Sequence, residues 1–88
     1  MIVFDPAKDE ANIAKHGVSL RLAEEMDLAS AFVRQDNRRD YQETRFNAYG
    51  YVDGRLYALT FTVRGDDVRA ISLRRARTKE LIRWRSES

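Results

Sequence analysis

The sequence predicts a small α+β protein that forms a single domain over residues 1–88, with the element order β-α-α-β-β-β-β-α. Three observations predict this class. Capping signals frame a helix near the N-terminus, an Asp-Gly pair joins two alternating strand patterns in the middle, and a strand-like segment runs into a short helical pattern at the end. A chain of this length can build only one compact core.

The first helix is predicted over residues 6–16. Residues 2–4 (IVF) resemble a short buried strand, and Asp5 can then cap the helix. Pro6 lies at the first helical position, where its missing N–H costs nothing, and Gly17 can end the helix. Three small residues at helical spacing are expected to form the inner face of this helix: Ala7, Ala11 and Ala14.

A second helix is predicted after Ser19, which can serve as its N-cap. Its apolar face would consist of four residues, namely Leu22, Ala23, Met26 and Ala29 or Ser30. Residues 31–36 (AFVRQD) resemble a strand, and residues 37–43 (NRRDYQE) are predicted to form a polar loop.

The central hairpin carries the clearest topology signal. Asp53-Gly54 lies between two alternating runs, and a type I′ turn needs positive φ at both of its central positions. A two-residue turn places four pairs on one side of the sheet, the expected core side: Val52 with Arg55, Gly50 with Tyr57, Ala48 with Leu59, and Phe46 with Phe61. The other side then carries Arg45, Asn47, Tyr49, Tyr51, Ala58, Thr60 and Thr62.

A second connection leads from this hairpin into residues 68–74 (VRAISLR). A three-residue loop over residues 65–67 would pair Phe61 with Ile71 and Leu59 with Leu73, whereas an even-numbered loop would bury Ala70, Ser72 and Arg74. We therefore expect the odd register, which adds Arg74 and Ser72 to the polar side. Arginine beside tyrosine, serine and threonine on one face of a sheet suits RNA.

Charge is distributed unevenly along the chain. Residues 1–36 hold four basic and seven acidic side chains, whereas residues 64–88 hold eight basic and four acidic ones. This polarity favours a polyanionic partner, although charge runs often mark only a solvated surface. The chain has no cysteine and one histidine, so we expect neither a disulfide nor a metal or other cofactor. No apolar run is long enough to cross a membrane and no export leader is visible, which predicts a cytoplasmic protein.

Several segments together resemble the BrnT toxins, which belong to the RelE-like toxins of bacterial type II toxin–antitoxin systems. They are FDPAK (4–8), Asn12, KHGVS (15–19), RFNAYG (45–50), FTVRGDDVRAISLRRA (61–76) and Glu80. In two places the chain departs from the family pattern: Thr44 stands where glutamate is usual, and Trp84 where tyrosine is common.

The resemblance implies a RelE-like fold, a small antiparallel sheet with two N-terminal helices packed on one face and a short C-terminal helix. It also implies a ribonuclease that inhibits translation and is neutralised by a BrnA-like antitoxin with a ribbon-helix-helix domain. DNA would be contacted only indirectly, through that antitoxin.

The candidate catalytic residues follow from RNA chemistry. RNA carries its own nucleophile, the 2′-OH, so a protein can act without a metal by aligning it, stabilising charge and moving protons. The leading candidates for charge stabilisation are Arg64, Arg74 and Arg75, of which Arg75 would turn to the other side of the sheet if strand alternation persists. We expect Arg64 and Arg74 to converge at one pocket.

Other candidates have competing structural explanations. Lys15 and His16 end the first helix, where the helix dipole favours cations, but histidine is also a natural proton carrier near neutral pH. Glu80 would be a general base or, more simply, a salt-bridge partner that orients arginines. The expected RNA-binding residues are Arg45, Tyr49, Thr60, Thr62 and Arg83. Thr78 is expected to cap the last helix, and Trp84 either packs on the domain or contacts the antitoxin.

Two alternatives to a ribonuclease toxin remain open from the sequence. The same basic face would serve a noncatalytic module that binds RNA or another protein. A degenerate toxin retained within a DNA-binding repressor complex would also show these residues.

Overall fold

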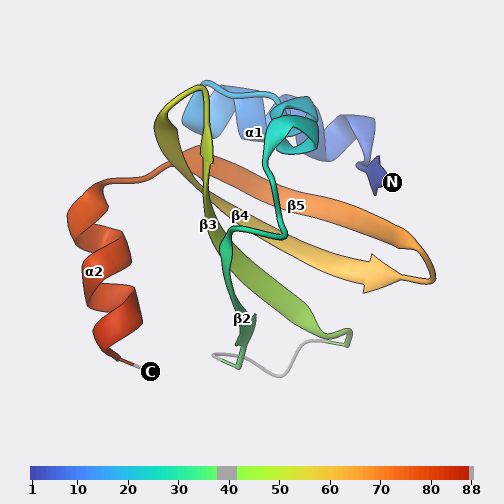
Figure 1. Cartoon of the computed structure of the whole chain (residues 1–88). Helices are drawn as coiled ribbons and strands as arrows, with labels where there is room; N and C mark the ends of the chain where they lie inside the picture. Colours follow the sequence, from blue (N-terminus) through green and yellow to red (C-terminus); the bar gives the residue numbers. More distant parts are fainter. Residues whose placement is uncertain (38–41, 88) are drawn as a thin grey trace.

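The computed structural model describes residues 1–37 and 42–87 and shows one five-stranded sheet with the strand order β1-β5-β4-β3-β2 (Figure 1). The elements are β1 (Ile2–Val3), α1 (Pro6–His16), the 3₁₀ helix η1 (Leu20–Glu25), β2 (Phe32–Asp36), β3 (Arg45–Val52), β4 (Arg55–Arg64), β5 (Asp67–Arg75) and α2 (Thr78–Ser86). The α+β class is confirmed, and the elements follow the predicted order except that a 3₁₀ helix stands in place of the second α-helix. Residues 38–41 of the predicted polar loop lie outside the described residues.

The sheet is mixed, so the expectation of a purely antiparallel sheet is wrong. Strand β1 runs parallel to β5, with Ile2 opposite Val68 and Val3 opposite Arg69, whereas the other three pairings are antiparallel. The two strands come from opposite ends of the chain, so no hairpin dictates their relative direction. Only two residues of β1 pair, which leaves most of the outer edge of β5 to other groups.

Helix α1 has the predicted bounds but not the predicted inner face. The Asp5 carboxylate accepts a hydrogen bond of 2.9 Å from the Ala7 N–H, and Gly17 ends the helix at φ 74°. The three alanines of the expected inner face are exposed, and the helix instead turns Asp9, Asn12 and His16 inward. Asn12 bonds to the main chain of Leu73 in β5, so α1 docks through polar groups against a strand edge.

The second predicted helix is a 3₁₀ helix that ends at Glu25. Its N-cap is Ser19, as predicted, and its hydroxyl accepts a hydrogen bond from the Arg21 N–H. The buried residues Leu20, Ala23 and Met26 recur at every third position, which matches the three residues per turn of a 3₁₀ helix. The predicted continuation through Ala29 or Ser30 is wrong, since both residues are exposed.

The hairpin of β3 and β4 has the predicted turn and the predicted register throughout. Asp53 and Gly54 both have positive φ, 54° and 74°, and the four expected pairs face one another. The main core lies on this side of the sheet, beneath η1; it contains Leu20, Ala23, Met26, Ala48, Val52, Tyr57, Leu59, Phe61, Ala70 and Leu73.

The hairpin of β4 and β5 combines two registers. Its turn leaves only Gly65 and Asp66 between the paired residues Arg64 and Asp67, so the expected three-residue loop is wrong. Phe61 faces Ala70, not Ile71, but Leu59 faces Leu73 as predicted. A β-bulge supplies the extra residue at Ile71, and it restores the alternation that buries Leu73 and turns Arg74 to the other side.

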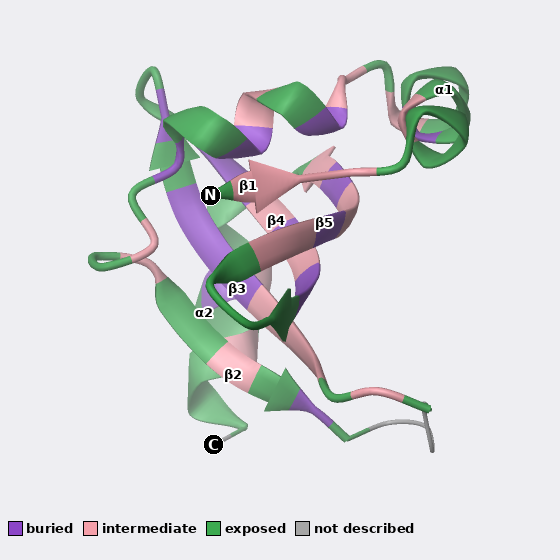
Figure 2. Ribbon diagram, turned by 90° about the vertical axis from the view of Figure 1, so that its right-hand side faces the viewer, coloured by how far each residue is buried: buried purple, intermediate pink, exposed green. Residues whose placement is uncertain are grey.

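Helix α2 packs on the side of the sheet that the sequence assigned to polar residues. Leu81 and Trp84 contact a second apolar cluster around Tyr49 and Leu56. The N-cap of α2 is Arg77, not Thr78, and the Glu80 carboxylate accepts the Arg77 N–H at 2.7 Å. Figure 2 shows that most residues of α2 are exposed, whereas the buried residues of the sheet lie mainly in β3 and β4. Among the described residues, no helix has the length and apolar character that crossing a membrane requires.

Candidate functional site

A cleft opens on the α2 side of the sheet, near the end of β5. Two rows of side chains form its floor: Tyr49, Ala58 and Arg74 face one another across three strands, and so do Asn47, Thr60 and Ser72. The cleft has a volume of about 450 Å³ and is lined by Lys15, His16, Asn47, Tyr49, Ala58, Thr60, Ser72, Arg74, Trp84 and Glu87. We call it the Arg74 cleft.

Helix α1 contributes Lys15 and His16 to the lining of this cleft. Lys15 and His16 form its last turn, and α1 ends where Gly17 adopts the left-handed conformation. The sequence therefore identified two residues, Lys15 and His16, that the fold brings to the same cleft as Arg74 although they are far apart in the chain.

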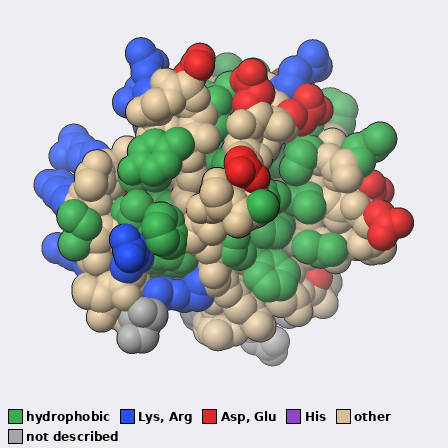
Figure 3. Space-filling model, viewed as in Figure 1, with side chains coloured by type: hydrophobic (Ala, Val, Ile, Leu, Met, Phe, Trp, Pro, Cys, Tyr) green, Lys and Arg blue, Asp and Glu red, His purple; other side chains and the backbone are tan. Residues whose placement is uncertain are grey.

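Positive charge gathers around α2. In Figure 3 the Lys and Arg side chains crowd the side where α2 lies, whereas most of the acidic ones lie elsewhere on this face. A neighbouring pocket of about 390 Å³ is lined by Tyr49, Lys79, Glu80, Arg83, Trp84 and Glu87. The predicted RNA-binding residue Arg83 lies in this pocket and not in the Arg74 cleft.

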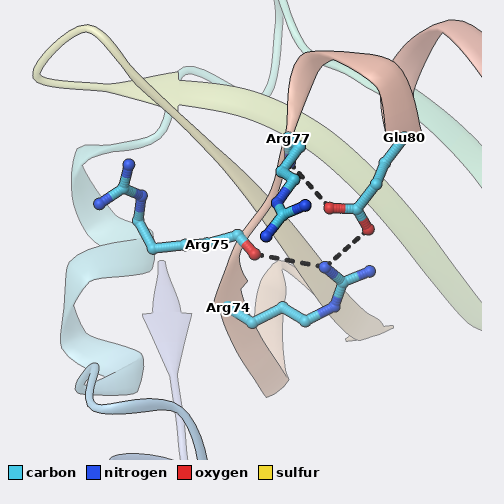
Figure 4. Close-up of polar contacts among 4 residues, drawn as sticks. All are labelled: Arg74, Arg75, Arg77 and Glu80. Atoms are coloured by element: carbon cyan, nitrogen blue, oxygen red, sulfur yellow. Dashed lines mark hydrogen bonds and ion pairs between the residues drawn. The ribbon is translucent and has the colours of Figure 1, made fainter.

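Arg74 is held in place by α2. Its Nη1 donates to Glu80 Oε1 at 2.9 Å and to the Arg75 carbonyl at 3.3 Å, while Glu80 Oε2 accepts the Arg77 N–H (Figure 4). The hydrogen bond from the Arg77 backbone, followed by the contact with Arg74, lowers the pKa of Glu80. Glu80 is therefore a weak base whose carboxylate already has partners, an arrangement that favours the orienting role over general-base catalysis.

Arg75 points away from this group (Figure 4). Its guanidinium lies 5.8 Å from the ring centre of Tyr57, which belongs to the core side of the sheet. Strand alternation explains this placement, because adjacent residues of β5 face opposite sides. The structure thus separates Arg75 from the cleft in which it was expected to act.

The expectation that Arg64 and Arg74 converge at one pocket is wrong. Arg74 faces Ala58, and Arg64 lies six residues further along β4, about 20 Å away at ~3.3 Å per residue. Arg64 does not line the Arg74 cleft; its Nη2 donates instead to Glu43 at 2.9 Å. This hydrogen bond lowers the pKa of Glu43. Both side chains lie on the same side of the sheet, but each is held in an ion pair of its own.

Two of the five predicted RNA-binding residues, Tyr49 and Thr60, line the Arg74 cleft. Thr60 lines the cleft and donates its hydroxyl to Asn47 Oδ1 at 2.9 Å. Tyr49 is only 9% exposed because Trp84 packs on it with 5.0 Å between ring centres, so its ring is not an open stacking platform. Thr62 is 2% exposed and donates its hydroxyl to the Thr44 carbonyl, which removes it from the surface.

Trp84 and Arg45 are also held by neighbours within the chain. The Arg34 guanidinium lies 4.1 Å from the Trp84 ring centre, so Trp84 packs on the domain, the simpler of its two predicted roles. Arg45 faces Asp36 across the β2–β3 pairing, outside the cleft.

Three polar residues of the cleft, namely Asn47, Ser72 and Glu87, were not among the predicted site residues. Asn47 lines the cleft, and because Thr60 donates to its Oδ1, its Nδ2 donors face elsewhere. The hairpin register placed Asn47 beside Thr60, so this pair was open to prediction. Glu87 lies beyond the short final helix, and the sequence carries no signal that brings it to the cleft.

The described residues contain no group of three His, Cys, Asp or Glu side chains that could hold a metal ion. The groups that the cleft offers are a guanidinium, an ammonium, an imidazole, an amide, hydroxyls and one carboxylate, that of Glu87. This set can bind a phosphodiester, donate hydrogen bonds to it and move a proton beside it.

Comparison with protein families gives one result. The family model for the ribonuclease toxin BrnT of type II toxin–antitoxin systems matches residues 4–80. The chain belongs to the BrnT family. This match confirms the predicted membership and the general function of the family as a ribonuclease toxin with an antitoxin partner. No curated protein matches the chain.

Proposed function

We propose that this BrnT protein is a metal-independent endoribonuclease whose active site is the Arg74 cleft, and that it inhibits translation in the cytoplasm. Its cognate partner would be a BrnA-like antitoxin with a ribbon-helix-helix domain, through which DNA is contacted. The observation that carries the proposal is the meeting of Lys15 and His16 from α1 with Arg74 from β5 in one cleft.

The chemistry uses the nucleophile that RNA already contains. The 2′-oxygen attacks the adjacent phosphorus, the bond from phosphorus to the 5′-oxygen breaks, and a 2′,3′-cyclic phosphate and a 5′-hydroxyl result. One proton leaves the 2′-OH and another reaches the departing 5′-oxygen. His16 is the residue of the cleft best suited to exchange protons near neutral pH.

Charge develops on the phosphoryl oxygens during this step. Arg74 and Lys15 supply two cations in the cleft, and a preorganised cation is most useful where charge forms in the transition state. Glu80 fixes the guanidinium of Arg74, so little reorganisation is needed when the phosphate arrives. Asn47 and Ser72 offer further polar contacts to the strand.

The test is RNA cleavage by the purified protein in excess chelator, measured for the wild type and for four single variants. We expect Arg74→Ala and His16→Ala each to reduce kcat by about 10²-fold or more, and Lys15→Ala to reduce it as well. Arg64→Ala is the matched control, because it also removes an ion-paired arginine from the same side of the sheet but outside the cleft.

Three results would count against the proposal. Equal losses in Arg64→Ala and Arg74→Ala would refute the location of the site. Cleavage that chelator abolishes would refute metal independence. RNA binding without any cleavage would favour a noncatalytic RNA-binding module. In contrast, growth arrest on expression that an adjacent gene relieves would support the toxin.

A further inference from the structure

We infer that Asn12 is a positioning residue of the active site: its side-chain amide ties α1 to the free edge of β5, which holds Lys15 and His16 opposite Arg74. The inference rests on the proposed function, since it names the residue that assembles the Arg74 cleft. Asn12 does not line that cleft but an adjoining pocket of about 270 Å³, and its amide is already occupied by hydrogen bonds within the chain.

The amide of Asn12 replaces a missing neighbouring strand. Its Nδ2 donates to the Leu73 carbonyl at 2.8 Å, and its Oδ1 accepts the Leu73 N–H at 3.1 Å. Both backbone groups of one β5 residue are thus satisfied by one side chain, as a paired strand would satisfy them. A third bond, from Nδ2 to the Val18 carbonyl at 2.8 Å, fixes the segment that follows α1.

The sequence positions of the partners explain why this contact bears on the site. Leu73 directly precedes Arg74, and Asn12 lies one helical turn before His16. Asn12 and His16 therefore lie on one side of α1. The tie joins the two segments that supply the cations of the cleft through an almost fully buried contact: Asn12 is 6% exposed and Leu73 0%.

Helix α1 brings little apolar surface to its contact with β5. Asn12 is its only buried residue within the described chain, and Ile13, its largest apolar side chain, is 47% exposed. A second inward side chain, the Asp9 carboxylate, accepts hydrogen bonds from the Ser19 hydroxyl at 2.9 Å and the Leu20 N–H at 2.7 Å, so it ties α1 to η1. This gives a matched control, because Asp9 anchors the same helix without contacting β5 through these bonds.

The experiment is a double-mutant cycle on RNA cleavage. Asn12→Ala is measured in the wild type and in a background that lacks both Lys15 and His16 side chains (Lys15→Ala with His16→Ala), at a temperature where circular dichroism shows every variant folded. Asn12→Asp, which keeps the shape and the acceptor, is the second variant, and Asp9→Asn is the control. The cycle is repeated as binding of a short 2′-O-methylated RNA, which lacks the nucleophile.

We expect Asn12→Ala to reduce kcat on the order of 10²-fold with little change in KM, because misplacing a catalytic group by about 1 Å costs that much. In the background without Lys15 and His16 the same change should have almost no effect. Asp9→Asn should lower thermal stability and leave kcat nearly unchanged. An equal loss in both backgrounds would overturn the inference, and so would a loss for Asp9→Asn as large as for Asn12→Ala.

Two further outcomes keep the inference separate from the proposed function. If the wild type does not cleave RNA, the proposed function fails, and the same cycle on RNA binding decides the inference: coupling supports it and additivity overturns it. If Asn12 variants do not fold, amide exchange of the wild type decides: slow exchange of the Leu73 N–H supports the tie, and exchange as fast as in an exposed loop overturns it.

Discussion

The contact of Glu80 with the N-terminus of α2 permits a prediction of stability. Glu80→Ala removes the acceptor of the Arg77 N–H, at 2.7 Å, and the partner of Arg74, at 2.9 Å. Loss of a helix cap costs about 1 kcal/mol, and a part-exposed ion pair contributes about 0–1 kcal/mol. Together they predict a loss of ~1–2 kcal/mol, or roughly 5–15 °C in Tm for a domain of this size.

Urea and thermal unfolding at neutral pH measure this effect. Glu24→Ala is the control, because Glu24 is an exposed glutamate on η1 and far from α2 in the chain. The stability of Glu80→Gln should lie between that of the wild type and that of Glu80→Ala, since an amide oxygen still accepts one hydrogen bond but carries no charge. A loss of stability in Glu80→Ala no larger than in Glu24→Ala would refute the reasoning.

The same contact predicts a pH dependence. The pKa of Glu80 is lowered in the folded state from its usual value of 4.5, so its charge stabilises the protein fully at pH values above that figure. The contribution disappears as the pH falls through the lowered pKa, because the protonated acid no longer pairs with Arg74. Below about pH 4.5, the free energy of unfolding should therefore fall less steeply with decreasing pH for Glu80→Gln than for the wild type. Parallel curves would contradict this.

Three further predictions concern packing and RNA binding. A Cβ at Gly50 would lie 2.8 Å from Met26 Cγ and Sδ, so Gly50→Ala should lower the free energy of unfolding in urea by about 1–3 kcal/mol. Met26→Ala in the same chain should relieve part of that cost, and strictly additive losses would contradict this explanation. Trp84→Ala should cost at least ~1–2 kcal/mol in the same assay, since it removes one aromatic and one cation–π contact; no loss would show that α2 is not anchored there. Arg74→Ala should reduce the slope of log affinity against log salt for single-stranded RNA by about 0.7, and Arg64→Ala should not; anisotropy titrations test both.

The sequence predicted the parts of the fold that depend on local signals. Asp5, Pro6 and Gly17 set the bounds of α1, and Asp53-Gly54 set the β3–β4 register, because each signal acts through the conformation of one or two residues. Arg74 was placed on the correct side of the sheet, although for an incomplete reason. The bulge at Ile71, and not an odd loop, turns it there.

Features that depend on distant partners could not be predicted in the same way. The alanines of α1 suggested an apolar inner face, but the helix meets a strand edge, where an amide is more useful than a methyl group. The polar side of the sheet was expected to be open, yet α2 covers Tyr49 there. Local pattern does not reveal which element will lie across a face or along an edge.

The site depends on three features of β5: the free edge at Leu73, the bulge at Ile71 and the ion pair of Arg74 with Glu80. The short β1 pairs only with Val68 and Arg69, and this leaves the edge at Leu73 for Asn12. The bulge at Ile71 then directs Leu73 into the core and Arg74 toward α2, where Glu80 receives it. A longer β1 would compete with α1 for the same edge, and removal of the bulged residue would reverse the two side chains. The chain thus places its cations together through backbone pairing, and Arg64, on the far side of the bulge, is left outside the cleft.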